Sequence, residues 1–444
     1  MNIIVVGNGG REHAICWKLA QSLEVERIVC VPGNGGTAAE AKCTNIDIPR
    51  CGYLDKSASP YVQIAAHENC TLAVIGPEDP LAAGLADEFW NAGIPCVGPK
   101  AAAAQLEASK DFAKAFMRKH NVACAASETF TDAASAAAYV KAHGAPIVVK
   151  ADGLAAGKGV VVAATEQDAL AAIADIMESG RVGDAGRKIV LEDYLEGTEI
   201  SVLAAVSVTE SGGETNIIVP FLPARDHKRL YDGAKGPNTG GMGAVCPLQD
   251  VSAGDLARFR SAILEPTLNG LAAERFDYRG FLFFGVMLTA DGPKLLEYNV
   301  RLGDPETQAV LPLMDADFAA LCRAITDGSL AQFELKWKDG FQVSPVVVSG
   351  GYPGSYPKGR PISIDGRKAA QAGAKIFIAG AVQAADGGTG LVTSGGRVLA
   401  CSAFGSTFDE AWKNAYAAVG AVHFDGQFFR TDIGLPGAAA SGKL

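Results

Sequence analysis

The sequence lacks the features that would place the chain at a membrane or on a nucleic acid. Its 444 residues contain no apolar run of membrane-spanning length. The formal net charge is −10, and lysine and arginine form no dense run, so the clustered basic surface that a phosphate backbone requires is missing. We therefore expect neither a membrane nor a nucleic acid as a partner.

The ten cysteines also lack any spacing typical of a metal site. They are scattered from Cys16 to Cys401 with no CxxC pair and no Cys/His cluster, which argues against zinc. The start, MNIIVVGNGGREH, has neither the basic lead nor the small-residue cleavage site of a signal peptide. We expect reduced, mostly buried thiols in a cytoplasmic protein.

Apolar side chains are plentiful. Hydrophobic residues make up 48% of the chain and charged residues 20%, a composition typical of globular proteins. At roughly 150 residues per domain, the length predicts about three domains.

Strand and helix patterns alternate over residues 1–105, which predicts a doubly wound parallel sheet. Three stretches there are polar loops that contain glycine and follow strands: GNGGREH, PGNGGT and GPEDP. Because ligands gather where the carboxyl ends of such strands meet loops, these loops predict a binding site on one edge.

The rest of the chain predicts further parts of α/β and α+β class. Residues 127–195 suggest a small lid around a glycine-rich loop, and residues 106–126 with 196–334 a central domain with longer strands. Residues 335–433 predict a β-rich closing domain. Residues 434–444 are rich in small side chains and predict a flexible tail.

The first glycine loop is an incomplete dinucleotide fingerprint. GxGxxG from Gly7 would need a glycine where Glu12 stands, and the second strand runs into Pro32 instead of an acid. Binding of NAD is therefore disfavoured. The backbone N–H groups of Gly9 and Gly10, at a helix N-terminus, can still hold an anion such as a phosphate, and a plain tight turn is the alternative.

The stretch VVKADGLAAGKGVVV places Lys150 at a strand end and Lys158 in a glycine loop before another strand. It is not a Walker A loop, because Asp152 occupies the first glycine's place and Gly159 that of the Ser/Thr. A strand–loop–strand flap with lysines can fold over a triphosphate. A hairpin with two surface lysines is the alternative.

The stretch KLLEYNVRLGDPETQ carries a polar strand face. Alternation along a strand points Glu297, Asn299 and Arg301 to one side, and Leu295 on that side indicates a half-buried setting. Oxygen ligands from Glu and Asn suit Mg²⁺, and a nearby arginine can neutralise a transferring phosphoryl group. A solvent-facing strand is the alternative.

Two further stretches give weaker signals. In IVLEDYLEGTEISV, Glu192 and Glu199 could hold ribose hydroxyls, although acids between strands are usually just solvated. The glycine-rich stretch RDHKRLYDGAKGPNTGGMGAV could wrap a small polar substrate or be a mobile surface loop. His227 has no evident nucleophile partner, so we expect it to anchor the loop.

Taken in order, GNGGREH, PGN, GPE, VVKADGLAAGKGV, DHKR, GPNTGGMGA and EYNVRLGDPETQ closely resemble the phosphoribosylamine-glycine ligase (glycinamide ribonucleotide synthetase) family of ATP-grasp enzymes. The resemblance covers essentially residues 1–433, and GPNTGGMGA and RLGDPETQ are its most specific motifs. Leu302, where an aromatic is usual, and Thr198, where an acid is common, are small departures that affect packing. The resemblance implies an N-terminal nucleotide-fold-like domain, a lid, a central ATP-grasp domain and a C-terminal domain.

The resemblance also implies an activity, the ATP-dependent ligation of glycine to 5-phosphoribosylamine through a glycyl phosphate in purine biosynthesis. We expect a monomer or weak dimer. The ATP ligands it implies are Lys110, Lys150, Gly157, Lys158, Gly159, Glu192, Leu195 through its backbone, and Glu199. The Mg²⁺ or Mn²⁺ ligands are Glu297 and Asn299. The phosphoribosylamine ligands are Gly9, Gly10, Glu78, Asp226, Asn238, Thr239, Gly240 and Gly241. Near glycine and the transferred phosphate it places Arg301, Gly303 and Asp304, and the catalytic set is Arg301, Lys158 and Asp304.

Two rival activities stay open at this stage. One is another ATP-grasp carboxylate-amine ligase or a carboxylase. The other, more remote, is a nucleotide-binding oxidoreductase.

Overall fold

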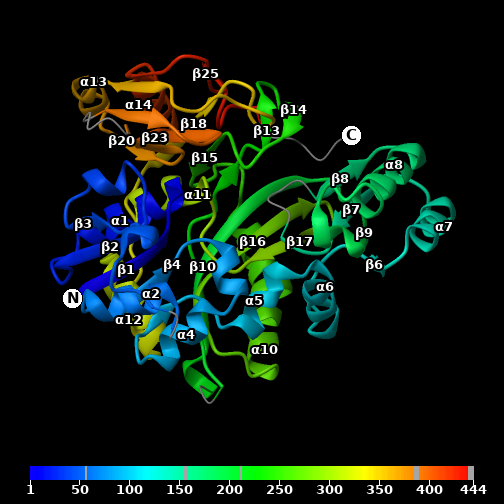
Figure 1. Ribbon diagram of the computed structural model, residues 1–444. Coiled ribbons are helices and arrows are strands. Elements are labelled where there is room, and N and C mark those ends of the chain that lie inside the picture. Colours follow the sequence, from blue (N-terminus) through cyan, green and yellow to red (C-terminus); the bar gives the residue numbers. More distant parts are fainter. Residues whose placement is uncertain (56–57, 155–158, 211–212, 385–389, 439–444) are drawn as a thin grey trace.

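The computed structural model describes residues 1–55, 58–154, 159–210, 213–384 and 390–438 (Figure 1). It contains a parallel sheet, a small lid sheet, a long antiparallel sheet and a C-terminal group of sheets. In Figure 1 the lid lies at one end of the long central strands, and the N-terminal and C-terminal parts lie at the other. Among the described residues, no helix combines the length and the apolar character needed to cross a membrane.

The N-terminal part is a five-stranded sheet with the order β3-β2-β1-β4-β5, and every neighbouring pair is parallel. Its strands are β1 (Asn2–Gly7), β2 (Arg27–Pro32), β3 (Cys43–Asn45), β4 (Leu72–Ile75) and β5 (Cys96–Val97). Its helices are α1 (Gly10–Ala20), α2 (Pro60–His67), α3 (Glu78–Ala82) and α4 (Leu85–Asn91). The apolar side chains of β1 are almost fully buried, as expected for a strand covered on both faces. The predicted doubly wound parallel sheet is confirmed.

Two helices, α5 (Ala101–Ala108) and α6 (Lys110–Lys119), lead to the lid. The lid is an antiparallel sheet with the order β6-β9-β7-β8 and has a hydrophobic core of its own. Its strands are β6 (Ser127–Phe130), β7 (Ile147–Ala151), β8 (Val160–Ala163) and β9 (Ile189–Asp193), and its helices are α7 (Ala133–His143) and α8 (Glu166–Met177).

The central sheet is antiparallel with the order β11-β10-β16-β17. Its strands are β10 (Thr198–Val208), β11 (Ile217–Pro220), β16 (Tyr278–Thr289) and β17 (Gly292–Asn299). Its helices are α9 (Ala253–Phe259), α10 (Glu265–Ala273), α11 (Glu306–Val310) and α12 (Phe318–Asp327). Most apolar side chains of β10 and β16 are buried, so this sheet is a rigid base for the cavity that lies on it.

The C-terminal part contains a six-stranded sheet with the path β12-β15-β18-β23-β20, where β25 also pairs with β18. Its strands are β12 (Arg225–Asp226), β15 (Gly243–Cys246), β18 (Phe341–Ser349), β20 (Ala374–Ile378), β23 (Arg397–Gly405) and β25 (Gln427–Phe428). The smaller sheets contain β13 (Arg229–Tyr231), β14 (Lys235–Asn238), β19 (Pro361–Ile364), β21 (Ala381–Gln383), β22 (Leu391–Thr393) and β24 (Val422–His423). The helices are α13 (Gly366–Gln371) and α14 (Phe408–Val419).

Two strands of that sheet, β12 and β15, come from the stretch expected to form the central domain. β15 pairs with β18, so the glycine-rich loop between β12 and β15 is held against the C-terminal part. The domain boundary at residue 334 stays a prediction. Residues 434–438, at the start of the expected flexible tail, make specific contacts: Gly434 N donates to His227 Nε2 at 3.0 Å, and Ala438 O accepts from Arg430 Nη2 at 2.6 Å.

Candidate active site

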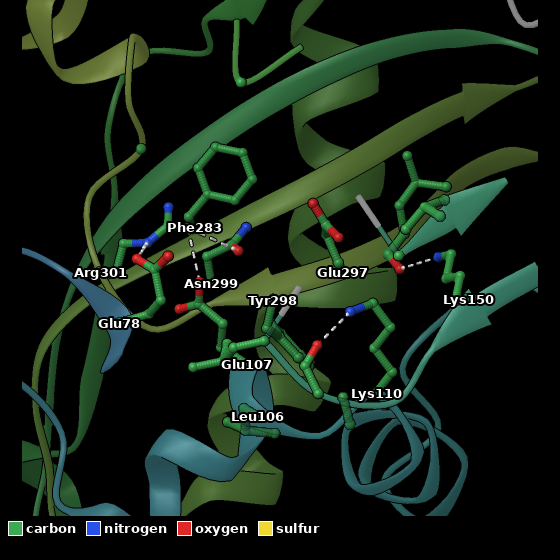
Figure 2. A pocket seen from close by; sticks show the side chains of 18 of the residues that line it. Glu78, Leu106, Glu107, Lys110, Lys150, Phe283, Glu297, Tyr298, Asn299 and Arg301 are labelled. Atoms are coloured by element: carbon green, nitrogen blue, oxygen red, sulfur yellow. Dashed lines mark hydrogen bonds and ion pairs between the residues drawn. The ribbon is translucent and has the colours of Figure 1, made fainter. Parts of the chain in front are cut away.

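One cavity lies where the lid, the central sheet and the loops of the N-terminal and C-terminal parts meet (Figure 2). The predicted site residues that line it are Glu78, Lys110, Lys150, Gly159, Glu192, Asp226, Thr239, Gly240, Glu297, Asn299, Arg301, Gly303 and Asp304. Figure 2 shows Lys150 at one end, Arg301 and Glu78 at the other, and Glu297 between them. The cavity therefore brings together motifs that are about 220 residues apart along the chain.

Paired lysines and one carboxylate define the first end of the cavity, which we call the lysine end. The register of β7 with β9 pairs Lys150 with Val190, so Lys150 and Glu192 share one face of the lid sheet. Glu192 forms ion pairs with Lys150 at 2.8 Å and with Lys114 of α6 at 2.9 Å. These three residues are at most 7% exposed. Burial would raise the pKa of Glu192, but Lys150 and Lys114 lower it below its ordinary value, so the carboxylate stays charged.

A β-bulge in β17 aims the next group into the cavity. Gly285 pairs with Glu297 and Val286 with Leu295, so Leu296 has no partner on β16. The bulge breaks the simple alternation expected from the sequence: Leu295 is in the core, while Leu296 and Glu297 both line the cavity. Burial favours a neutral Glu297, but Lys228, Lys150 and Lys110 together lower its pKa.

The second end, which we call the arginine end, is rich in carboxylates. Arg301 Nη2 lies 2.8 Å from Glu107 Oε1, and Arg301 Nε lies 3.2 Å from Glu78 Oε2. Arg11 Nη1 is 3.8 Å from the same Glu78 oxygen. Burial raises the pKa of Glu107 to about 7 although Arg301 opposes that shift. This end therefore pairs two arginines with Glu78 and Glu107, and the pKa of Glu107 lies near neutral pH.

Asp226 and Gly241 meet at the floor of the arginine end. Asp226 Oδ1 is buried and has no hydrogen-bond partner among the described residues. Burial, with the nearby Glu306 carboxyl, raises the pKa of Asp226 well above its ordinary value. Gly241 has φ +115°, and a Cβ there would lie 2.6 Å from Asp226 Oδ1 and 2.4 Å from Pro305 Cδ. Only glycine lets this loop approach so closely.

Several predicted residues lie beside the cavity without lining it. Glu199 forms an ion pair with Lys228, which does line it. Gly9 is adjacent, since a Cβ there would lie 3.4 Å from Asp304 Oδ2. Gly10 packs against Gln308, and Leu195 lies between β9 and β10. Asn238 lines a separate cavity between the lid and the C-terminal part. Gly157 and Lys158 lie outside the described residues.

Other residues of the site were not singled out from the sequence. Lys114 and Glu107 come from the helices α6 and α5 and belong to no motif, whereas Lys228 and Glu306 lie inside the motifs DHKR and EYNVRLGDPETQ. Arg397 of β23 reaches from the C-terminal part to Asp304, with Nη1 donating to Asp304 O at 2.7 Å and Nη2 lying 3.4 Å from Asp304 Oδ2. Helix periodicity marks one face of α6 as buried, but no local signal could have assigned these side chains to a site.

Comparison with known proteins decides the family. The phosphoribosylglycinamide synthetase N domain matches residues 1–107, the ATP-grasp (A) domain of that synthetase matches residues 108–307, and its C domain matches residues 342–436. The chain belongs to the phosphoribosylglycinamide synthetase family. The predicted resemblance, and with it an ATP-dependent ligase of purine biosynthesis, is confirmed.

Named relatives of this synthetase family are similar over their full length. The phosphoribosylamine–glycine ligase of Clostridium acetobutylicum is 46% identical over 98% of this chain and 99% of its own, and that of Vibrio cholerae is 44% identical over 98% of each. The crystal structure of the Thermotoga maritima phosphoribosylamine–glycine ligase superposes with a TM-score of 0.79 at 30% identity, covering 98% of this chain and 100% of that one.

A more distant likeness concerns the fold alone. The biotin carboxylase domain of Hydrogenobacter thermophilus 2-oxoglutarate carboxylase, solved with MgADP, ADP and bicarbonate, has a TM-score of 0.70 at 12% identity. It covers 96% of this chain and 91% of that one.

Proposed function

We propose that the protein joins glycine to 5-phosphoribosylamine with consumption of ATP, giving glycinamide ribonucleotide, ADP and phosphate. The observation that carries the proposal is the division of one cavity into a lysine end and a carboxylate-rich arginine end. A triphosphate needs excess positive charge, whereas an amine substrate is attracted by negative charge. Each end therefore suits one of the two kinds of substrate.

ATP would occupy the lysine end. Lys114 and Lys150 share a single carboxylate there, Glu192, and Lys110 also lines the cavity. Phosphate oxygens can replace Glu192 as partners of a lysine, and the freed carboxylate can accept from ribose hydroxyls. We keep Lys158 and Gly157, together with Gly159, Leu195 and Glu199, as proposed ATP ligands.

The donor set between the two ends fits Mg²⁺. Figure 2 shows Glu297 with no dashed line to a neighbour, and Asn299 Oδ1 accepts from Arg301 Nη2 at 3.2 Å. A charged carboxylate without a hydrogen bond to another described residue, next to an amide oxygen, is a pair of hard ligands. Magnesium or manganese bound there would neutralise charge on the ATP phosphates. Glu297 and Asn299 would hold the ion, and Lys150 and Arg301 would flank it.

The substrates that carry an amine would lie at the arginine end. Arg301 can hold the glycine carboxylate, and Glu78 and Asp226 offer oxygens to amines and ribose hydroxyls. We keep Thr239, Gly240, Gly9 and Gly10 as the proposed ligands of the phosphoribosylamine phosphate. That phosphate would have to displace Tyr352 Oη from Gly240 N and Glu12 Oε2 from Gly9 N. Gly303 and Asp304, with Arg397 behind Asp304, would fix the loop that carries Arg301.

The chemistry has two steps. A glycine carboxylate oxygen attacks the γ-phosphorus of ATP and ADP leaves, which gives glycyl phosphate. The amine of phosphoribosylamine then attacks the acyl carbon, loses a proton, and phosphate leaves as the amide forms. No side-chain nucleophile is required. Closure of the lid over the cavity would keep water from the acyl phosphate.

The experiment is an assay of ADP release with Mg-ATP, glycine and freshly generated phosphoribosylamine, with each substrate omitted in turn and the product identified by mass. Release that needs both co-substrates and yields glycinamide ribonucleotide supports the proposal. Release that proceeds without glycine, or that depends on bicarbonate, would favour a carboxylase. We expect the enzyme to act in the cytoplasm as a monomer or weak dimer.

A further inference from the structure

Three cysteines meet in the N-terminal part, away from the ligase cavity. Cys16 lies on α1, Cys30 on β2 and Cys43 at the start of β3. The parallel register pairs Ile28 with Cys43, so Cys43 and Cys30 share one face of the sheet, the face on which Cys16 of α1 lies. The spacing along the chain showed no metal motif, because the sheet register and the packing of α1 bring the three together.

The distances between the three sulfurs suit one ion. Cys16 Sγ and Cys30 Sγ are 3.4 Å apart, and all three sulfurs lie within 4.8 Å of one another. In a tetrahedral site with metal–sulfur bonds of about 2.3 Å, neighbouring sulfurs are about 3.8 Å apart. The Cys16–Cys30 distance is about 0.4 Å shorter than that value and none of the three distances exceeds it by more than about 1 Å, so small side-chain rotations would complete the site. Among the described residues this is the one group of three metal-ligating side chains so close together.

The surroundings favour a cation there. Cys16 and Cys30 are buried, with exposures of 0% and 1%, while Cys43 is half-buried and gives access from the edge of the sheet. A cysteine binds a metal ion through its sulfur as the thiolate, so an ion here would meet three sulfur ligands. Thiolates prefer soft ions and discriminate against Mg²⁺.

We propose that Cys16, Cys30 and Cys43 form a three-thiolate site for a soft d¹⁰ metal ion of the zinc, cadmium and copper(I) class. Binding forms three metal–sulfur bonds, and the remaining thiol protons leave to solvent. The ligase cavity supplies none of these ligands, so the site is independent of the proposed activity. An ion here would tie α1 to β2 and β3 and would stabilise the folded chain.

The test uses the full chain, reduced and stripped of metal with a chelator, and Cd²⁺ as the probe. We expect a thiolate-to-metal charge-transfer band that saturates at one ion per chain with an intensity typical of three thiolates. The ion should survive dialysis and should raise the melting temperature. Competition by Zn²⁺ and by copper(I) then shows which ion of the class binds most tightly.

Variants locate the site. Cys43→Ser should weaken Cd²⁺ binding by more than about tenfold, since one of three ligands is lost. Cys51→Ser, another half-buried cysteine of the same part, is the matched control and should bind as the natural chain does. Circular dichroism checks that each variant folds, and Cys30→Ala is a second ligand variant in case Cys43→Ser does not. Absence of the band in the natural chain, or equal binding by all three variants, would overturn the proposal.

Discussion

The two ends of the cavity differ in how they balance charge. At the lysine end Lys114 and Lys150 share one carboxylate, Glu192, and all three are nearly fully buried. At the arginine end Arg301 contacts two carboxylates, Glu107 and Glu78. The lysine end therefore has two cations for one carboxylate, whereas at the arginine end Arg301 and Arg11 face Glu78 and Glu107. The two ends of one cavity thus offer different charge to the two kinds of substrate that we propose for them.

The largest expected effect comes from removing Arg301 at the arginine end. Arg301→Ala should lower turnover about a hundredfold or more, because losing one preorganised donor to a transferring phosphoryl group costs about 3 to 4 kcal/mol. Steady-state kinetics with all three substrates measures it. Arg301→Lys keeps the positive charge but lacks the planar guanidinium, so its turnover should lie between that of the natural chain and that of Arg301→Ala. Near-normal turnover of the alanine variant would contradict the assigned role.

A smaller effect is expected at the lysine end. Lys150→Met should raise the KM for ATP roughly tenfold to a hundredfold, because a charge-assisted hydrogen bond is worth about 1.5 to 3 kcal/mol, while the KM for glycine should change little. Lys188→Met is the matched control, since Lys188 is a lid lysine that pairs with Asp111 and Asp152 and does not line the cavity. Equal changes in both KM values would show that the two ends are not separate in function.

Between the ends, Glu297→Gln should raise the Mg²⁺ concentration needed for half-maximal turnover by about tenfold, since a charged hard ligand becomes a neutral one. A magnesium titration at saturating ATP measures it. Glu128→Gln, at an exposed position of strand β6, serves as the control. An unchanged magnesium requirement in Glu297→Gln would remove Glu297 from the metal site.

The smallest expected effect concerns stability and pH. Because the folded-state pKa of Glu107 is raised from 4.5 to about 7, the unfolded chain ionises first as the pH rises. Glu107 therefore costs no stability below pH 4.5, and its cost grows until about pH 7. Glu107→Gln should match the natural chain in acid and exceed its unfolding free energy by roughly 1 to 3 kcal/mol above neutrality.

Urea denaturation at several pH values tests this, with Glu88→Gln on the exposed face of α4 as the control. A difference between Glu107→Gln and the natural chain that stays constant with pH would mean that folding does not shift the pKa of Glu107.

Motifs on single strands predicted much of the cavity. Lys150, Glu192, Glu297 and Asn299 all line it, because each lies on a strand whose alternation can be followed locally. The bulge that moves Leu295 into the core was not predictable, since it depends on pairing with β16. Whether these residues have the proposed roles stays a prediction.

Contacts between residues far apart in the chain could not be predicted from the sequence. Glu107 sits in an alanine-rich helix with no motif, and it meets Arg301 only because α5 packs beside β17. The pairing of β15 with β18 could not be predicted either, because β15 is a short apolar strand that could pair with a strand of any of several sheets. The cysteine cluster likewise arises from three elements whose sequences show only ordinary buried residues.

The hydrogen bonds of Arg397 mark a place where an inhibitor could bind. Its guanidinium donates to the backbone oxygens of Gly240 and Asp304 and so ties the C-terminal part to the arginine end. A small molecule that inserted between Arg397 and these carbonyls would displace only the protein's own hydrogen bonds and need not compete with cellular ATP. Such a compound would act where the C-terminal part meets the arginine end, away from the lysine end at which we propose that ATP binds.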